Sequence, residues 1–252
     1  MNMSDKKSLF DNDDLEKLAR LRVRHGLCII LGSRSASRLA VFQEWFPNTI
    51  FPAVFQLAPD IDEKATRSDD PYELTLEITK RKNRAVLEKF TRMCADHKDW
   101  PVARPCTVLF ITSDQVSVFR DENGLEIREK PTSEEENKAF LQSYSNSMVE
   151  TCGTLCVHRF HMESMGQPKI PDKSCYEYDV NRVHFNTISD EVIHRVVSRG
   201  ESIYCSGGFV VEDEDLAQCV KHIDGCVEGV MGLNPFLLKQ MIFDVLFPPS
   251  VV

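Results

Sequence analysis

The stretch that most constrains this chain is LCIILGSRSASR at residues 27–38, an apolar run followed by a glycine, small hydroxylated residues and arginines. Residues 27–31 have the length and β-branched content of a buried strand, and Gly32 marks the point where the backbone turns. The residues after it predict the start of a helix, with Ser33 or Ser35 as its N-cap. The stretch therefore predicts a strand, a turn and a helix in direct succession.

This arrangement suits an anion. A strand that leads into a helix N-terminus leaves backbone N–H groups with a positive dipole behind them, and phosphate oxygens bind to such groups. Two serines and Arg38 would complete the site. The alternative is an ordinary strand-turn-helix with a serine cap and surface arginines. The stretch alone favours this alternative, because it lacks the P-loop pattern of a glycine, four residues and Gly-Lys-Ser/Thr.

The composition is that of a globular protein, and 252 residues suffice for one large domain or two small ones. Thirty basic and thirty-nine acidic residues give a net charge of −9. This balance argues against a general binder of nucleic acid or of anionic membranes. It still allows a local basic site for a polyanionic small molecule.

The sequence also indicates a compartment. It has no apolar run of the roughly 18 to 20 residues that span a membrane, and its polar, acid-containing N-terminus resembles neither a signal peptide nor a transit peptide. Nine cysteines are scattered through apolar runs, as expected for reduced, buried thiols. We therefore expect a cytoplasmic protein.

Helical and strand patterns interleave along the chain, which predicts a mixed α/β fold. A disordered tail is expected over residues 1–12, and the polar loop at 161–175 is expected to be an insertion or a hairpin tip. Helices are predicted at 13–24, 72–95, 133–144, 189–198, 212–220 and 234–247, and strands at 27–31, 50–57, 107–112, 116–119, 126–128, 149–160, 176–185 and 207–211. Asn123-Gly124 predicts a hairpin turn between two of these strands.

Several charged residues are predicted at strand ends or in loops, where open α/β sheets place ligands. Asp114 directly follows the 107–112 strand, and it is either a turn residue or a metal ligand or general base. Glu63 lies in a polar loop, Lys82 on the long helix, and Lys130 after the hairpin. Each alone is best explained as a solvated side chain. Together with Arg38 they form the inventory that holds a triphosphate and a divalent metal.

A zinc site is an alternative function for some of the cysteines and histidines. Cys152, Cys156 and His158 alternate along a predicted strand, and Cys219 precedes His222 by three residues. Structural zinc is usually bound by compact pairs such as Cys-x-x-Cys, which this chain lacks. Buried thiols are the favoured interpretation.

Taken in order, these pieces resemble the Maf-like (septum-formation inhibitor) family of nucleotide pyrophosphatases, nearer its 7-methyl-GTP subgroup. The resemblance extends from residue 27 to residue 247 and includes the long helix with Lys82. The matching segments are LGSRSASR at 31–38, DIDEKATR at 60–67, ITSDQVSV at 111–118, EKP at 129–131, FNTISDEVI at 185–193, YCSGGFVVED at 204–213 and VMGLNPFLL at 230–238. It divides the chain into an N-terminal extension, 1–26, and a Maf-like domain, 27–252.

The resemblance implies a mixed β-sheet flanked by helices with a nucleotide-binding cleft, as in inosine triphosphatases. It implies hydrolysis of a nucleoside triphosphate between the α- and β-phosphates, with Mg²⁺, Mn²⁺ or Co²⁺ as cofactor and a homodimer as an option. Carried over residue by residue, it assigns catalytic roles to Asp114, Glu63, Lys82 and Lys130, metal binding to Glu63 and Asp114, and substrate binding to Ser33, Arg38, Gln115 and Glu212. No nucleic-acid or membrane partner is expected.

The chain departs from the family pattern at two places. Ala36-Ser37 replaces the family's Pro-Arg or Pro-Trp, so one contact, basic or aromatic, is missing. Asp213-Glu214-Asp215 replaces a Gly-x-Gly segment, which puts the shape of that loop in question. These departures suggest a rival hypothesis, a catalytically silent nucleotide-binding protein. A Nudix enzyme is disfavoured, because its helix signature is absent from the sequence.

The residues at the base-recognition positions indicate a subgroup. Ser113-Asp114-Gln115 with Glu212 resembles the pattern of the 7-methyl-GTP enzymes. The dTTP/UTP enzymes are similar to one another in having Asp-Thr at the positions of 114 and 115 and a glutamine at the position of 212. A carboxylate can accept two hydrogen bonds from guanine's Watson-Crick edge. It also attracts the positive charge of a methylated guanine, which strengthens the contact. The alternative is an acid placed at a helix N-terminus for the dipole, and the residues alone do not separate the two.

Overall fold

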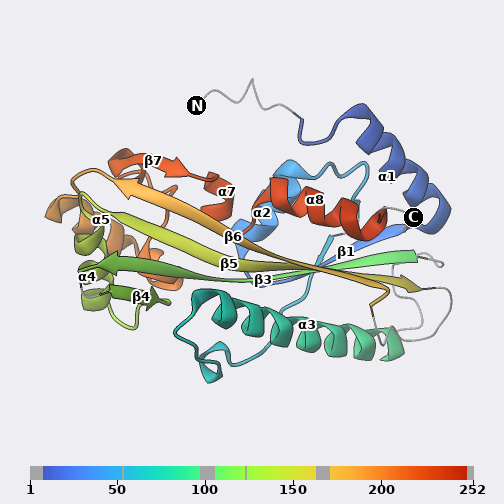
Figure 1. Ribbon diagram of the computed structural model, residues 1–252, viewed down its shortest axis with the longest axis horizontal. Helices are drawn as coiled ribbons and strands as arrows, with labels where there is room; N and C mark the ends of the chain where they lie inside the picture. Colours follow the sequence, from blue (N-terminus) through green and yellow to red (C-terminus); the bar gives the residue numbers. More distant parts are fainter. Residues whose placement is uncertain (1–7, 53, 97–105, 123, 163–170, 249–252) are drawn as a thin grey trace.

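The computed structural model describes residues 8–52, 54–96, 106–122, 124–162 and 171–248 (Figure 1). Its centre is a seven-stranded sheet in the order β2-β1-β3-β5-β6-β7, with β4 paired to β3. The strands are β1 Leu27–Gly32, β2 Val54–Gln56, β3 Cys106–Asp121, β4 Gly124–Arg128, β5 Met148–Met162, β6 Lys173–Phe185 and β7 Val220–Asp224. β1 pairs in parallel with β2 and β3, and all other pairs are antiparallel, so the predicted mixed sheet is confirmed.

Helices cover both faces of this sheet. The α-helices are α1 Asn12–His25, α2 Ala36–Trp45, α3 Pro71–Asp96, α4 Glu134–Tyr144, α5 Asp190–Arg199, α6 Leu216–Cys219, α7 Val227–Val230 and α8 Pro235–Leu246; the 3₁₀ turns are η1 Glu63–Ala65, η2 Ser202–Tyr204 and η3 Ser206–Gly208. In Figure 1, α3 runs along one face, α2 and α8 lie on the other, and α4 and α5 gather at the far end. Side-chain oxygens cap five of these helices as polar N-caps should, from Asp11, Ser35, Ser133, Ser189 and Asn234.

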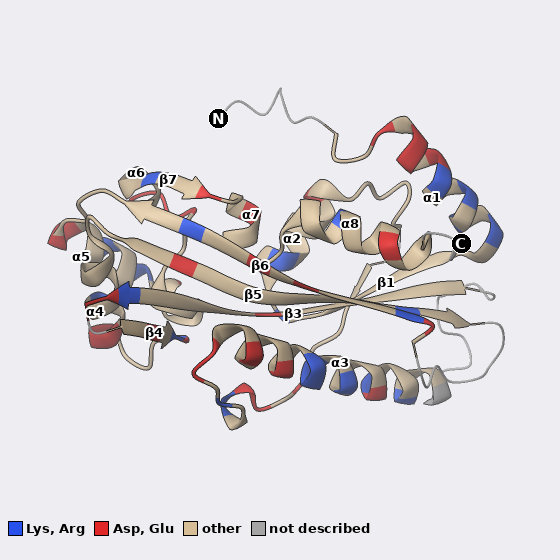
Figure 2. Ribbon diagram, viewed as in Figure 1, with Lys and Arg blue, Asp and Glu red and all other residues tan. Residues whose placement is uncertain are grey.

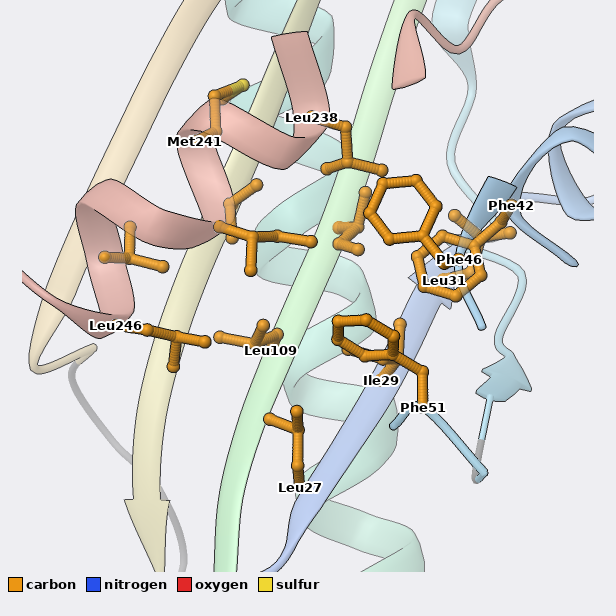
Figure 3. Packing of buried hydrophobic residues seen from close by; sticks show 14 of the residues in the cluster. Leu27, Ile29, Leu31, Phe42, Phe46, Phe51, Leu109, Leu238, Met241 and Leu246 are labelled. Atoms are coloured by element: carbon orange, nitrogen blue, oxygen red, sulfur yellow. The ribbon is translucent and has the colours of Figure 1, made fainter. Parts of the chain in front are cut away.

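The strand β1 is apolar throughout because both of its faces are covered. Leu27, Ile29 and Leu31 point toward α2 and α8 and pack with Phe42 and Leu238 (Figure 3). The alternate residues of β1 pack against α3 on the opposite face. Burial of both faces explains why β1 reads as a continuous hydrophobic run.

The prediction of two separate strands around Asp114 was wrong. Residues 106–121 form one continuous strand, β3, and Asp114 lies in its middle, where it pairs with Thr154 of β5. The Ser-Asp-Gln sequence suggested a turn because these residue types favour turns. The ladder to β5 extends unbroken from Cys106 to Phe119 and overrides that local preference.

Two predictions near residue 210 were also wrong. Gly207 and Gly208 have φ angles of 72° and 68°, so the predicted strand over 207–211 is replaced by the turn η3. The helix predicted over 212–220 is confined to α6, because β7 begins at Val220. β7 and α7 had no predicted counterpart; β7 is a short edge strand with exposed polar residues, which weakens its alternating pattern.

Part of the predicted N-terminal tail is ordered against the core. Phe10 is 3% exposed and Leu18 is fully buried in the same cluster as β1. Lys239 of α8 donates to the carbonyl of Leu9 at 2.9 Å and pairs with Asp14. Disorder over residues 8–12 was therefore a wrong prediction, whereas residues 1–7 lie outside the described part.

The predicted hairpins hold where the structure describes them. β3 and β4 pair up to Asp121 and Gly124, with Asn123 outside the described residues. β5 and β6 extend to Met162 and from Lys173, so they flank most of the predicted 161–175 loop, of which 163–170 lie outside the description. Among the described helices, none is both long and apolar enough to cross a membrane.

Candidate active site

The site lies at a gap along one edge of β3. β1 pairs with this edge up to Thr112, and β4 pairs with it only from Ser117 onward. The opposite edge of β3 is paired with β5 throughout this region. On this edge of β3, the backbone between Thr112 and Ser117 is not paired with β1 or β4, so it can bind side chains. The gap lies beyond the carboxyl end of β1, where α/β sheets bind ligands.

Lys82 of α3 reaches this gap and joins two carboxylates. Its Nζ atom lies 2.7 Å from Oδ1 of Asp114 and 2.9 Å from Oε1 of Glu63. Lys82 and Asp114 are each 5% exposed, whereas Glu63 is exposed on η1. Figure 2 shows that basic positions follow an acidic first part of α3. The helix sequence places Lys82 within the basic segment 80–84. The three predicted residues form one hydrogen-bonded cluster.

Arg38 approaches the same strand from the other face of the sheet. Its Nη1 atom donates to the carbonyl of Ser113 at 3.2 Å, and its Nε atom donates to the carbonyl of Gly232 at 3.0 Å. Lys82 donates to the same Ser113 carbonyl at 3.4 Å. Two cations from opposite faces thus converge on one backbone oxygen, one residue before Asp114.

Gly232 makes room for this arginine. Its φ angle is 101°, a conformation that side chains rarely adopt, and an added Cβ would lie 2.8 Å from Nε of Arg38. The glycine therefore fixes both the backbone turn before α8 and the position of the guanidinium.

Burial and charge shift the site's proton affinities in different directions. Burial raises the pKa of Asp114, and the nearby Glu63 adds to the rise, while Lys82 opposes it. Burial also acts to raise the pKa of Glu63, but the charges of Lys82, Lys130 and Arg38 outweigh it and lower that pKa. Burial lowers the pKa of Arg38, with Asp114 and Glu63 opposing, yet a guanidinium keeps its charge in proteins. The site holds several charges of both signs.

Three further predicted residues lie around this cluster. Lys130 is exposed and close enough for its charge to lower the pKa of Glu63. Ser33 is buried at the end of β1, where its Oγ atom accepts from the backbone N–H of Ser35 at 3.1 Å. Gln115 faces away from Asp114 along the strand, and its amide donates to the carbonyl of Gly229 at 2.8 Å.

Among the described residues, Glu212, like Lys130, makes no hydrogen bond or ion pair with Glu63, Lys82 or Asp114. It lies on the turn after η3, where partial burial of its carboxyl group raises the pKa and the charge of Glu201 adds to that rise. A helix-dipole role for Glu212 is contradicted, because α6 starts four residues later and has only four residues.

Ion pairs with α5 hold the unusual acidic segment after Glu212. Arg199 pairs with Asp213 at 2.7 Å, with Glu214 at 2.9 Å and also with Asp215. The Asp213 side chain accepts from the backbone of Asp215 and of the next residue at 3.0 Å each. The segment that replaces Gly-x-Gly therefore has a defined turn of its own.

The sequence-based predictions missed three groups near the site: the backbone carbonyl of Ser113 and the side chains of Arg67 and Arg34. The Ser113 carbonyl has no signature in the sequence, because any residue carries one. Arg67 lies in the quoted DIDEKATR segment and pairs with Glu129 at 3.1 Å, and Arg34 of LGSRSASR pairs with Asp60. Their presence in the matched segments was a usable signal for both arginines.

The donor set suits a hard divalent cation. Magnesium prefers carboxylate oxygens and keeps several water ligands. Lys82 contacts one oxygen of Glu63 and one of Asp114, which leaves each carboxylate a second oxygen. These two residues could therefore hold Mg²⁺ together with water or phosphate oxygens.

The cysteines that could have indicated a zinc site are buried thiols. Cys152, Cys156 and Cys219 are free and buried, and burial raises the pKa of Cys156 to about 12. Such thiols pack as small apolar groups. His158 donates to or accepts from the Tyr176 hydroxyl at 2.9 Å instead of facing a thiol pair.

Comparison with known proteins agrees with this architecture. A relative from Dictyostelium discoideum, named 7-methyl-GTP pyrophosphatase, is 35% identical over 86% of this chain and 96% of its own length. A Chlamydia trachomatis (serovar D) dTTP/UTP pyrophosphatase and a Synechococcus nucleoside triphosphate pyrophosphatase are each 27% identical over 86% of the chain and 93% of their own lengths. The family model of the Maf-like proteins matches residues 28–245. The chain therefore belongs to the Maf-like protein family.

Proposed function

We propose that this protein hydrolyses a nucleoside triphosphate between its α- and β-phosphates and releases a nucleoside monophosphate and pyrophosphate. The observation that carries the proposal is Lys82, which joins Glu63 and Asp114 beside Arg38 at the gap in β3. This cluster combines cations for phosphate with carboxylates for water and metal. The names of the relatives in the family support the same reaction class.

Each residue of the cluster has a role in this chemistry. Arg38 and Lys130 attract the phosphate oxygens and neutralise the charge that develops on the leaving group. Asp114 orients a water molecule and accepts its proton as the oxygen attacks phosphorus, and the bond from that phosphorus to the bridging oxygen breaks. Lys82 holds Asp114 in place through its 2.7 Å ion pair. A divalent cation held by Glu63 and Asp114 would supply further charge neutralisation.

We assign 7-methyl-GTP, or another modified purine nucleotide, as the substrate. Glu212 offers a carboxylate that can accept hydrogen bonds from guanine and attract a cationic base. The 35% identical relative bears the name of that activity, although more distant relatives are named for dTTP and UTP. Activity on dTTP and UTP is therefore the alternative.

A nucleotide panel decides between the two substrates. We expect purified protein with Mg²⁺ to release pyrophosphate faster from 7-methyl-GTP than from dTTP or UTP. Glu212→Gln should lower the preference for 7-methyl-GTP by roughly 5-fold to 150-fold, the value of about 1–3 kcal/mol for one bidentate base contact. Glu214→Gln, an exposed neighbour, is the matched control and should leave the preference unchanged. Faster turnover of dTTP or UTP by the parental protein overturns the substrate assignment.

The pH dependence of turnover should follow Asp114. A general base must be deprotonated, so kcat/KM falls as pH drops through its pKa. Because burial raises the pKa of Asp114, the acidic limb should lie above the ordinary aspartate value of about 3.9. The pKa of Glu63 is lowered, so titration of Glu63 should occur below the ordinary glutamate value and not account for a limb above it. A limb at or below pH 3.9 in a stopped assay contradicts the assignment of Asp114.

The rival function is nucleotide binding without hydrolysis, which the Ala36-Ser37 departure suggested. Tight binding of 7-methyl-GTP measured by calorimetry, without pyrophosphate release in the presence of Mg²⁺, Mn²⁺ or Co²⁺, would support it.

All nine cysteines are free, which fits the reducing cytoplasm that we propose as the compartment. A homodimer stays a prediction.

A further inference from the structure

A second group of metal-ligand side chains lies at the opposite edge of the sheet from β1. His184 of β6 and His222 of β7 are register partners on antiparallel strands, so they stand directly opposite each other. Their rings stack with centroids 4.0 Å apart and an interplanar angle of 13°. Asp224 lies two residues after His222 and therefore on the same face of β7.

Both imidazoles direct a nitrogen at one carboxylate. The Nε2 atom of His184 lies 3.0 Å from Oδ2 of Asp224, and the Nε2 atom of His222 lies 3.7 Å from Oδ1. One ligand atom from each of the three residues falls within 4.8 Å of the other two. Two nitrogens and one oxygen thus converge at the surface, where the histidines are partly exposed.

We propose that His184, His222 and Asp224 form a surface site for a borderline divalent transition metal such as Zn²⁺. Imidazole nitrogen is a preferred ligand of Zn²⁺, Ni²⁺ and Cu²⁺, whereas Mg²⁺ selects oxygen ligands. A tetrahedral Zn²⁺ binds nitrogen and carboxylate oxygen at about 2.0–2.2 Å, so small side-chain rotations would close these three ligands on one ion. Water would complete the coordination. The site is separate from the carboxylates of Glu63 and Asp114.

A simple ion pair explains less of this geometry. One histidine beside Asp224 would suffice for a surface pair, and such pairs stabilise a fold little. Here the cross-strand register brings a second imidazole to the same carboxylate. The convergence of all three ligand atoms is the feature that a metal site needs.

The ion would hold an edge strand in place. In the described part of the chain, β7 pairs only with β6, and the register of this pair shifts between His184 and Phe185 of β6. In Figures 1 and 2, β7 is a short strand at the margin of the sheet, with an acidic position near its end. α7 follows β7 and carries Gly229, whose carbonyl accepts from Gln115. A metal that ties β7 to β6 would therefore stabilise the segment that supports one side of the nucleotide site.

The test is Zn²⁺ binding by the full chain in excess Mg²⁺ and a phosphine reductant, measured by equilibrium dialysis and metal analysis. The parental protein should bind one Zn²⁺ that the His184→Ala/His222→Ala variant does not bind. Asp224→Asn should weaken the affinity at least about tenfold, since loss of even an outer hydrogen-bond partner costs 10-fold to 100-fold. His194→Ala is the matched control, because His194 is an exposed histidine of α5 outside the site.

A second measurement needs no variant of the site. Proton–nitrogen spectra of the histidine side chains should show that added Zn²⁺ shifts two of the seven imidazoles, and the His194→Ala spectrum should retain both shifts. Equal Zn²⁺ binding by the parental and double-histidine proteins overturns the site, as does a parental protein that binds none. Zinc-induced shifts spread over other imidazoles also overturn it.

Discussion

Asp114→Asn is expected to lower kcat by about 10²-fold to 10⁴-fold, the usual contribution of a general base. An amide keeps the shape of the side chain and cannot accept a proton from water. Glu63 still neutralises Lys82 at 2.9 Å, so the fold and the phosphate-binding cations should be preserved. Steady-state pyrophosphate release gives kcat, and calorimetry with 7-methyl-GTP gives the dissociation constant, which should change only slightly.

Asp121→Asn is the control for this experiment. Asp121 is the exposed last residue of the same strand, so its replacement tests the effect of one lost charge on β3. Its kcat should stay close to the parental value. An Asp114→Asn protein with more than a tenth of parental turnover would remove Asp114 from the role of base.

Lys82→Met is expected to lower the free energy of unfolding by about 3–5 kcal/mol near neutral pH, because it leaves the Asp114 carboxylate buried without its partner. Turnover should also be lost. Removal of the ammonium raises the pKa of Asp114 further, so the folded state then binds a proton more tightly than the unfolded state. The variant should therefore recover stability as pH falls through that raised pKa. Urea unfolding at about pH 7 and about pH 5 measures both effects.

Two further proteins make this result specific. Lys80→Met replaces an exposed lysine two residues away on α3 and should have little effect on stability. Lys82→Met/Asp114→Asn removes both buried charges and should recover much of the lost stability, since a neutral pair leaves no uncompensated carboxylate. A double variant as unstable as Lys82→Met would show that packing of the lysine stem, not its charge, carries the effect.

Local chemistry made the first part of the fold predictable. β1 is buried on both faces, and Ser35 caps α2 with a side-chain hydrogen bond to the backbone of Arg38 at 3.2 Å, so both left clear patterns in the sequence. β7 left none, because it is held by pairing with β6 and its side chains are mostly exposed. Register across strands is a long-range property that a single segment does not contain.

The structure brings Arg38, Glu63, Lys82 and Asp114 together, but the local structure around Asp114 was predicted wrongly. Asp114 was expected at a strand end, whereas it lies inside β3, where tertiary pairing outweighs turn propensity. Lys82 was one of several lysines on a helix, and only the fold shows that it is buried between two carboxylates. The contacts of Arg38 with two carbonyls were invisible, since backbone acceptors have no residue type.

The length of β3, β5 and β6 has a consequence for motion. These strands connect two ends of the molecule, one with β1, α2 and α8 and the other with β4, α4 and α5, and each end has its own hydrophobic cluster (Figure 1). Arg38 belongs to the first end, Lys130 and Glu212 to the second, and Asp114 lies between them. A change in the bend of these three strands would alter the distance between Arg38 and Glu212, to which we assign phosphate and base binding. The width of the proposed nucleotide site thus depends on the curvature of the sheet.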